Sequence, residues 1–172
     1  DRICKTLELE CETVPIGFKN IAELMLREDI LIGGEESGGV GIKNHIPERD
    51  GILMGLLMLE AIAHSGTTLS EMVRRLWQEF GEFHFRRVDL HVPLSQGSRL
   101  VQGLKESPPR RFAGLQWAAT DSMDGTKLIF TDESWILFRQ SGTEPLLRIY
   151  CEAGSADQVV RMITEARQLA GV

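Results

Sequence analysis

The segment WILFRQSGTEPLLRIYC, residues 135–151, decides how the second half of the chain folds. Two apolar runs, 135–139 and 146–151, flank a polar stretch that contains glycine and proline. Short apolar runs bounded by such turn residues are typical of neighbouring strands. The pattern therefore predicts two strands joined by a loop that is held at both ends.

Working outward from this segment, the sequence predicts an antiparallel meander. Strand-like runs occupy residues 115–120 and 127–131, and a stretch from 83 to 92 is strand-like with imperfect alternation. The turn pairs between the runs are Asp124-Gly125 and Asp132-Glu133. Helices are expected at 95–106 and after a capping box at 155–158. Residues 81–172 are thus predicted to form an α+β domain.

Residues 1–80 are predicted to be α/β. A helix is expected from Phe18, followed by a short buried strand at 30–32 and a glycine-rich loop. Asp50 is the expected N-cap of an apolar helix that ends near residue 63, and an all-apolar helix is usually buried. Thr68 and Glu71 form a capping box for another helix, and a domain boundary is expected between residues 79 and 84.

Composition narrows the class of protein. The chain has 172 residues and a net charge of −6, which disfavours nucleic-acid binding but allows a local anion site. Three cysteines without Cys-x-x-Cys spacing indicate reduced thiols of a cytoplasmic protein rather than disulfides or zinc. No leader sequence and no membrane span are expected, and the chain is expected to start inside a larger protein.

The loop from Arg139 to Pro145 is the first candidate site. Arg139 can donate a fork of hydrogen bonds to a phosphate, while Ser141 and Thr143 offer hydroxyl groups. Gly142 allows close approach of a ligand to the backbone and can hold a positive φ that turns amides toward an anion. The alternative interpretation is a polar hairpin loop with an exposed arginine.

A second candidate is the acidic, glycine-rich loop 33–39. The adjacent carboxylates Glu35 and Glu36 cannot both be buried unpaired, so they should face solvent, a cation or the hydroxyls of a polyol, together with Ser37. The alternatives are a flexible solvated loop and a metal site. Lys19, at the start of a helix, could reach a phosphate or donate a proton, or could simply cover Phe18 at the surface.

The four histidines lack metal-ligand spacing, and His45 is the one worth following because it lies just after the acidic loop. No Ser-His-Asp or Cys-His pairing is suggested. From its own residues the chain therefore offers binding groups rather than a recognisable catalytic set.

Four motifs, in this order along the chain, resemble the α-D-phosphohexomutase family of phosphoglucomutases and phosphomannomutases. They are Gly17-Phe18-Lys19, Gly34-Glu35-Glu36-Ser37-Gly38-Gly39, Arg49-Asp50-Gly51-Ile52 and Arg139-Gln140-Ser141-Gly142-Thr143-Glu144-Pro145. The resemblance runs from about residue 12 to the end. It implies the last part of the family's third domain over 1–80, which reads the sugar, and its phosphate-binding fourth domain over 81–172. That fourth domain is a four-stranded antiparallel sheet with two helices, similar in shape to the TATA-box-binding protein, which implies no DNA binding.

The resemblance also implies a reaction, the interconversion of hexose 1-phosphate and hexose 6-phosphate through a bisphosphorylated sugar. A phosphoserine and a Mg²⁺ held by an Asp-rich loop serve that reaction, and neither loop is found in this chain. The fragment alone is therefore expected to be inactive, with a hexose phosphate and the missing N-terminal domains as its partners. Its expected role is to bind the substrate as part of a phosphoglucomutase or phosphomannomutase.

The resemblance assigns roles to single residues. Glu35 and Ser37 match the loop that reads sugar hydroxyls. The residues that match the loop gripping the non-reacting phosphate are Arg139, Ser141, Gly142 and Thr143. Lys19 matches a lysine near the phosphosugar in some members. No catalytic residue is assigned beyond Lys19 as a candidate.

The sequence departs from the family pattern at two positions. Some members have histidine, a candidate proton-transfer group, where Gly39 stands, so the general acid or base is unassigned and a phosphoglucosamine mutase is the less favoured branch. Gln140 stands where proline is frequent. The other hypotheses left open are a non-catalytic sugar-phosphate-binding module and a purely structural domain.

Overall fold

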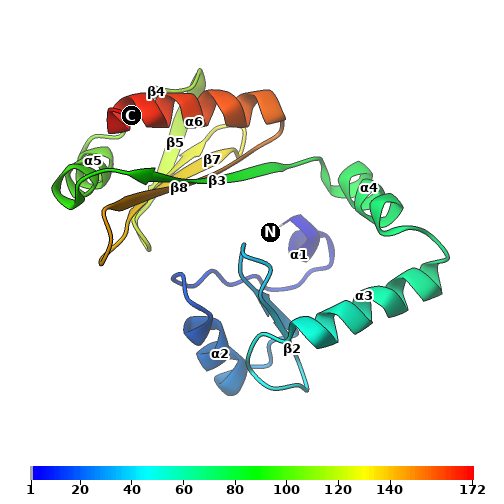
Figure 1. Cartoon of the computed structure of the whole chain (residues 1–172). Helices are drawn as coiled ribbons and strands as arrows, with labels where there is room; N and C mark the ends of the chain where they lie inside the picture. Colours follow the sequence, from blue (N-terminus) through cyan, green and yellow to red (C-terminus); the bar gives the residue numbers. More distant parts are fainter. Residues whose placement is uncertain (1) are drawn as a thin grey trace. The chain divides into compact units, whose positions relative to one another are not determined.

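Residues 2–172 are described by the computed structural model, and backbone contacts separate them into two units at the Phe80–Gly81 bond. The first unit contains α1 (Arg2–Thr6), α2 (Phe18–Arg27), β1 (Ile32–Gly34), β2 (Val40–Ile42), α3 (Gly51–Ser65) and α4 (Leu69–Phe80). The second contains β3 (His84–His91), α5 (Leu94–Glu106), β4 (Arg111–Phe112), β5 (Leu115–Asp121), β6 (Thr126–Phe130), β7 (Trp135–Gln140), β8 (Leu146–Ala153) and α6 (Ala156–Ala170) (Figure 1).

In the first unit, α2 packs closely on an antiparallel hairpin made of β1 and β2. Two glycines of the hairpin make this contact possible. A Cβ added at Gly33 would overlap Ile21 of α2, and one added at Gly41 would lie 3.1 Å from the Phe18 ring. The hairpin turn at residues 35–39, predicted as a glycine-rich loop, is therefore held next to the helix that begins at Phe18.

The helix caps of this unit follow the sequence pattern. The Asp50 carboxylate accepts hydrogen bonds from the backbone N–H groups of Ile52 and Leu53 at 3.0 and 2.9 Å, which confirms it as the N-cap of α3. The capping box before α4 is also confirmed: Glu71 accepts from the Thr68 N–H at 2.8 Å, and the Thr68 hydroxyl accepts from the Glu71 N–H at 3.3 Å. These side chains satisfy amides that a helix start leaves open.

Burial in the first unit differs from the prediction. The apolar helix α3 has no buried residue, with Ile52 82% exposed, and Ile32 in the predicted buried strand is 60% exposed. Phe18 is the one buried large apolar side chain among residues 2–80. The expectation of burial is wrong here because an apolar face is buried only by a second layer, and a two-stranded hairpin provides little of one.

No single helix among residues 2–172 has the length and apolar character needed to cross a membrane. The helices α3 and α4 meet that test only as a pair, with a bend of 81° between them.

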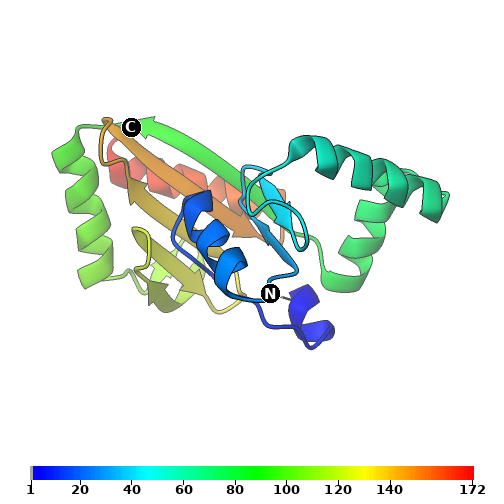
Figure 2. The ribbon, with the colours of Figure 1, turned by 90° about the horizontal axis from the view of Figure 1, so that it is seen from below.

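The second unit is a six-stranded antiparallel sheet in the order β3-β8-β7-β6-β5-β4. The predicted meander is confirmed for the consecutive strands β5 to β8. The predicted four-stranded sheet is corrected to six strands, because β3 pairs along its whole length with β8 and the two-residue β4 extends the opposite edge. The two predicted helices, α5 and α6, are present and pack on the sheet (Figures 1 and 2).

The core of this unit lies between the sheet and these two helices. Alternate residues of the central strands point into it, as the two-residue period of a strand requires. Fully buried examples are Ile136 and Phe138 of β7, Leu147 and Ile149 of β8, and Met162 of α6. This core fixes β7 and β8, and with them both ends of the loop that connects them.

Cys151 belongs to the same core, and its slow reaction with thiol reagents should show that it is buried. Burial raises the pKa of its thiol to about 11, so the reactive thiolate is scarce at neutral pH. We expect two of the three cysteines, Cys4 and Cys11, to react with a thiol reagent in the native chain and the third only after denaturation. Mass spectrometry of the labelled protein identifies the sites, and modification of native Cys151 at the rate of Cys11 would contradict this packing.

Candidate functional site

The loop between β7 and β8 is tied down on every side by backbone hydrogen bonds. The strands pair up to Gln140 and Leu147, and the Ser141 N–H then donates to the Leu146 carbonyl at 2.9 Å. The Pro145 carbonyl accepts from the Val92 N–H at 3.1 Å. The loop therefore has little freedom left to lose when it binds a ligand.

Arg139 is held at the base of this loop with most of its donors unused. Its Nε donates to the Asp124 carboxylate at 3.1 Å, and the two side chains are 25% and 27% exposed. Its two terminal nitrogens have no hydrogen-bond partner among residues 2–172. A single anchoring bond through Nε leaves the outer edge of the fork available to a phosphate.

A second arginine, Arg148, stands opposite Arg139 in the β7–β8 register. Residues paired in this way lie on the same face of the sheet. Its guanidinium is already engaged, with Nη2 3.4 Å from the Glu144 carboxylate and Nε 3.8 Å from that of Asp89. Sequence reasoning did not single out Arg148, although its place in the strand after the loop was the available indication.

The hydroxyl of Ser141 serves the loop itself. Ser141 is buried, and its oxygen accepts hydrogen bonds from the backbone N–H groups of Thr143 at 3.5 Å and Glu144 at 3.2 Å. Thr143 is exposed. The structure thus places Ser141 as a brace of the turn and Thr143 as the more accessible hydroxyl.

Gly142 does not use the positive φ that a glycine allows, because its φ is not among the positive values found in the described residues. No atom lies within 4 Å of a Cβ added there, so the backbone faces open space. The other backbone N–H groups of residues 141–146 have acceptors within the loop, whereas that of Gly142 has none among the described residues. The Gly142 N–H is therefore available to donate a hydrogen bond to an anion.

The acidic loop of the first unit is a tight turn at the tip of the β1–β2 hairpin. The Glu35 N–H donates to the Gly39 carbonyl at 2.9 Å, and the Gly38 N–H donates to the Glu35 carbonyl at 3.0 Å. Ser37 is exposed on this turn. The turn is therefore ordered by its own backbone hydrogen bonds.

Glu35 is paired with an arginine that sequence reasoning assigned no role. Its carboxylate is 14% exposed and lies 3.4 Å from Nη1 of Arg49, whose guanidinium also covers the Phe18 ring at 5.3 Å. The Arg49 N–H and guanidinium hold the pKa of Glu48 below its usual value. The Glu35 carboxylate thus faces a cation of its own unit, one of the outcomes expected for this loop.

The remaining candidates of the first unit are His45 and Lys19. His45 lies 2.8 Å from the Asp50 carboxylate, and the Leu53 N–H, followed by the His45 ring, lowers the pKa of Asp50. This arrangement makes His45 part of the α3 cap. Lys19 is exposed in the first turn of α2, with no ion pair among residues 2–172.

Two family models match this chain. Residues 1–80 match the description "Phosphoglucomutase/phosphomannomutase, alpha/beta/alpha domain III", and residues 103–169 match "Phosphoglucomutase/phosphomannomutase, C-terminal domain". The chain belongs to the phosphoglucomutase/phosphomannomutase family. It supplies the third and the C-terminal domains of that family, in the order that the motifs predicted.

Relatives of the family show how much of a full-length protein this chain spans. A phosphoglucomutase/phosphomannomutase of Thermococcus kodakarensis is 34% identical over 92% of this chain but only 32% of its own length. A chloroplastic phosphoglucomutase of Arabidopsis thaliana is 32% identical over 96% of the chain and 29% of its own length. The chain therefore spans about a third of the curated relatives that it matches.

Solved structures give the same picture. A Thermus thermophilus protein described as a phosphomannomutase superposes with a TM-score of 0.79 at 37% identity, covering 99% of this chain and 33% of the other. Parafusin, a phosphoglucomutase of Paramecium, gives 0.78 at 26% identity, covering 99% and 35%. Both units of this chain thus have counterparts within single, longer family members.

The family departure at Gly39 has a structural counterpart. A Cβ at this position would overlap the side chain of Arg49 and lie 3.4 Å from the Glu35 carboxylate. The space that a side chain at position 39 would occupy is taken by Arg49. Where some family members have histidine, this chain therefore has glycine, and the side chain of Arg49 fills the adjacent space beside Glu35.

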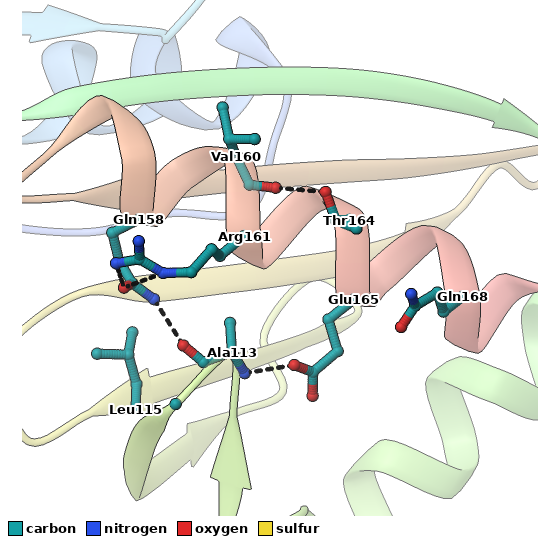
Figure 3. A pocket seen from close by; sticks show the side chains of 9 residues that line it. Ala113, Leu115, Gln158, Val160, Arg161, Thr164, Glu165 and Gln168 are labelled. Carbon is teal, nitrogen blue, oxygen red and sulfur yellow. Dashed lines mark hydrogen bonds between the residues drawn. The ribbon is translucent and has the colours of Figure 1, made fainter.

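A depression of about 600 Å³ elsewhere in the second unit is lined by polar groups that bond to one another (Figure 3). It lies between α6 and the β4–β5 turn. The Gln158 amide donates to the Ala113 carbonyl at 3.0 Å, Glu165 accepts from the Ala113 N–H at 2.6 Å, and Arg161 bonds to Gln158. These polar groups already satisfy one another, and they fix a turn residue whose φ is +49°.

Within the part of the chain that the structure describes, no group of three or more His, Cys, Asp or Glu side chains could hold a metal ion. The Mg²⁺ that the family resemblance implies is expected on an Asp-rich loop outside this chain, and the described residues offer no site for it.

Proposed function

We propose that this chain is the substrate-binding C-terminal portion of a phosphohexomutase that interconverts hexose 1-phosphate and hexose 6-phosphate. The proposal depends on the β7–β8 loop, which is held at both ends in a member of this family and carries the unused terminal nitrogens of Arg139 and the open Gly142 amide. A guanidinium together with neutral backbone donors suits a phosphate monoester.

In the proposed reaction, the residues of this chain orient the substrate. Arg139, Gly142 and Thr143 hold the phosphate that is not being transferred. Glu35 accepts hydrogen bonds from sugar hydroxyls, and Ser37 can donate or accept them. Lys19 is a further candidate for contact with the phosphosugar. Holding the phosphate orients the substrate, and orientation of this kind can supply several kcal/mol of barrier reduction.

The transferred phosphoryl group belongs, on this proposal, to segments outside the chain. A phosphoserine would donate it and a Mg²⁺ would stabilise the charge, with hexose 1,6-bisphosphate as the intermediate. Phosphoglucomutase and phosphomannomutase activities are named for the relatives at 34% and 32% identity, and they support this class of substrate. A cytoplasmic location is part of the same proposal.

Calorimetry and a coupled mutase assay test the proposal together. The chain should bind glucose 1-phosphate or mannose 1-phosphate, should not bind the unphosphorylated sugars at the same concentrations, and should show no turnover. If the unphosphorylated sugars bind as tightly as the sugar phosphates, the β7–β8 loop does not act as a phosphate-binding site. Turnover by the chain alone would contradict the division of roles between this fragment and the missing domains.

Gly142→Ala should separate binding from folding. The position has an ordinary φ and open surroundings, so we expect the free energy of unfolding to change by less than about 0.5 kcal/mol. The added methyl group should hinder a ligand that approaches the backbone at this residue and weaken phosphate binding about tenfold, which corresponds to about one lost hydrogen bond.

The matched control for this variant is Gly154→Ala, at a second loop glycine without a positive φ or a close neighbour. Calorimetric titration with glucose 1-phosphate should give wild-type affinity for the control and reduced affinity for Gly142→Ala. Equal affinities for the two variants would show that ligands do not approach the Gly142 amide.

A further inference from the structure

Gln140, at the end of β7, turns its side chain inward to the base of the phosphate loop. It follows Phe138 by two residues, so it shares the sheet face that packs against α5. Its Nε2 lies 3.2, 3.3 and 3.1 Å from the carbonyl oxygens of Ser141, Glu144 and Leu146. One amide group thus joins the beginning, the middle and the end of the loop.

The orientation of this amide is fixed by its surroundings. Three carbonyl oxygens surround Nε2, and only a donor can face them without repulsion. The other end, Oε1, is buried and has no hydrogen-bond partner among the described residues. A buried unpartnered acceptor costs free energy, so the donor contacts must offset that cost.

Gly97 of α5 makes room for Oε1. A Cβ built on Gly97 would overlap the Gln140 amide oxygen and lie 2.8 Å from its carbonyl carbon. Gly97 is buried inside the helix and its φ is not positive, so its backbone conformation does not require glycine. The requirement for a small residue at position 97 therefore comes from the side chain of Gln140.

The contact with the Ser141 carbonyl sets the direction of the Gly142 amide. In a planar trans peptide, the carbonyl oxygen of one residue and the N–H of the next point to opposite sides. When Gln140 draws the Ser141 carbonyl inward, the Gly142 N–H must point away from Gln140. The next two amides, of Thr143 and Glu144, are taken by the Ser141 hydroxyl.

We infer that Gln140 is a positioning residue for anion binding: its amide, seated against Gly97, orients the Gly142 N–H toward the ligand. This inference rests on the proposed phosphate binding by the loop. It also accounts for glutamine at a position where related loops often carry proline, because a side-chain clamp can stiffen the loop without a proline ring.

Two variants remove the clamp in different ways. Gln140→Met keeps a long side chain but has no donor, and Gly97→Ala displaces the amide without altering the loop sequence. Both should weaken the binding of inorganic phosphate and of glucose 1-phosphate about tenfold. The matched control is Gly103→Ala in the same helix, where an added Cβ meets no atom within 4 Å and affinity should stay at the wild-type value.

A double variant distinguishes positioning from simple loss of stability. Gly97→Ala combined with Gln140→Ala removes the steric overlap, so its melting temperature should return to that of Gln140→Ala, while phosphate affinity stays low. If phosphate affinity instead follows the melting temperature across these variants, Gln140 acts only on folding and the inference is wrong.

The direction of the Gly142 N–H bond can also be measured without any ligand. Residual dipolar couplings of the ligand-free chain should show this bond reoriented in Gln140→Met and in Gly97→Ala and unchanged in Gly103→Ala. An unchanged bond direction in Gln140→Met would overturn the inference. If the wild-type chain binds no phosphate, the proposed function fails, and the dipolar couplings still decide whether Gln140 positions the amide.

Discussion

Arg139→Ala is expected to lower the affinity of the chain for glucose 1-phosphate by about 10- to 100-fold. Hydrogen bonds to a charged group contribute about 1.5–3 kcal/mol each, and each 1.4 kcal/mol is a factor of ten in affinity. The anchoring bond from Nε to Asp124 leaves the terminal nitrogens to make those bonds. Because both partners are only about a quarter exposed, loss of Arg139 should also cost some stability, and the melting temperature is measured beside the affinity.

Two further variants sharpen this expectation. Arg139→Lys keeps the charge but loses the planar fork, so its affinity should fall between those of the wild type and the alanine variant. Arg161→Ala, on α6, removes an arginine that bonds to Gln158 of its own helix and should leave the affinity unchanged. Calorimetry provides the comparison. An alanine variant at position 139 that binds within twofold of the wild type would contradict the assignment of the fork to phosphate.

Gly125→Ala should have the largest effect on stability among the variants considered. Gly125 has a φ of +108°, and a Cβ there would overlap the carbonyl oxygen of Phe138 and lie 3.2 Å from the Arg139 Cα. Backbone strain and the displacement of β7 should together lower the free energy of unfolding by about 2–4 kcal/mol. The turn that carries Asp124 would move as well, so phosphate affinity should also fall.

Gly114→Ala is the control that isolates the steric part of this effect. Gly114 also has a positive φ, +82°, but a Cβ there meets no atom within 4 Å. Its expected cost is about 1 kcal/mol, the strain of a non-glycine residue in that conformation. Urea unfolding monitored by circular dichroism measures both variants. Equal destabilisation would mean that the turn does not press against β7.

The sequence was sufficient for features that are encoded locally. The caps at Asp50 and Ser155 were predicted from side chains that bond to amides two or three residues away, and both are confirmed. The strands β5 to β8 were found from short apolar runs between turn pairs. In each case, the interacting groups lie close together in the chain.

Features that depend on distant partners were missed. The strand β4 is too short to show a pattern, and its Phe112 is recognisable as core only through its ring contacts with Phe130 and Phe138. The exposure of α3 could not be read from its apolar residues, because burial depends on what packs against them. The candidate site shows the same difference. Arg139 could be predicted from a local motif, whereas the contact between Gln140 and Gly97 joins segments far apart in the sequence and could not.

The most direct test of the account is a residue-resolved NMR titration of the isotopically labelled chain. The amide resonances of Gly142 and Thr143 should move saturably with glucose 1-phosphate and with inorganic phosphate, and should stay in place with glucose. Unmoved resonances at these two amides, with millimolar sugar phosphate bound elsewhere on the chain or not at all, would contradict the claim that the β7–β8 loop is a phosphate clamp.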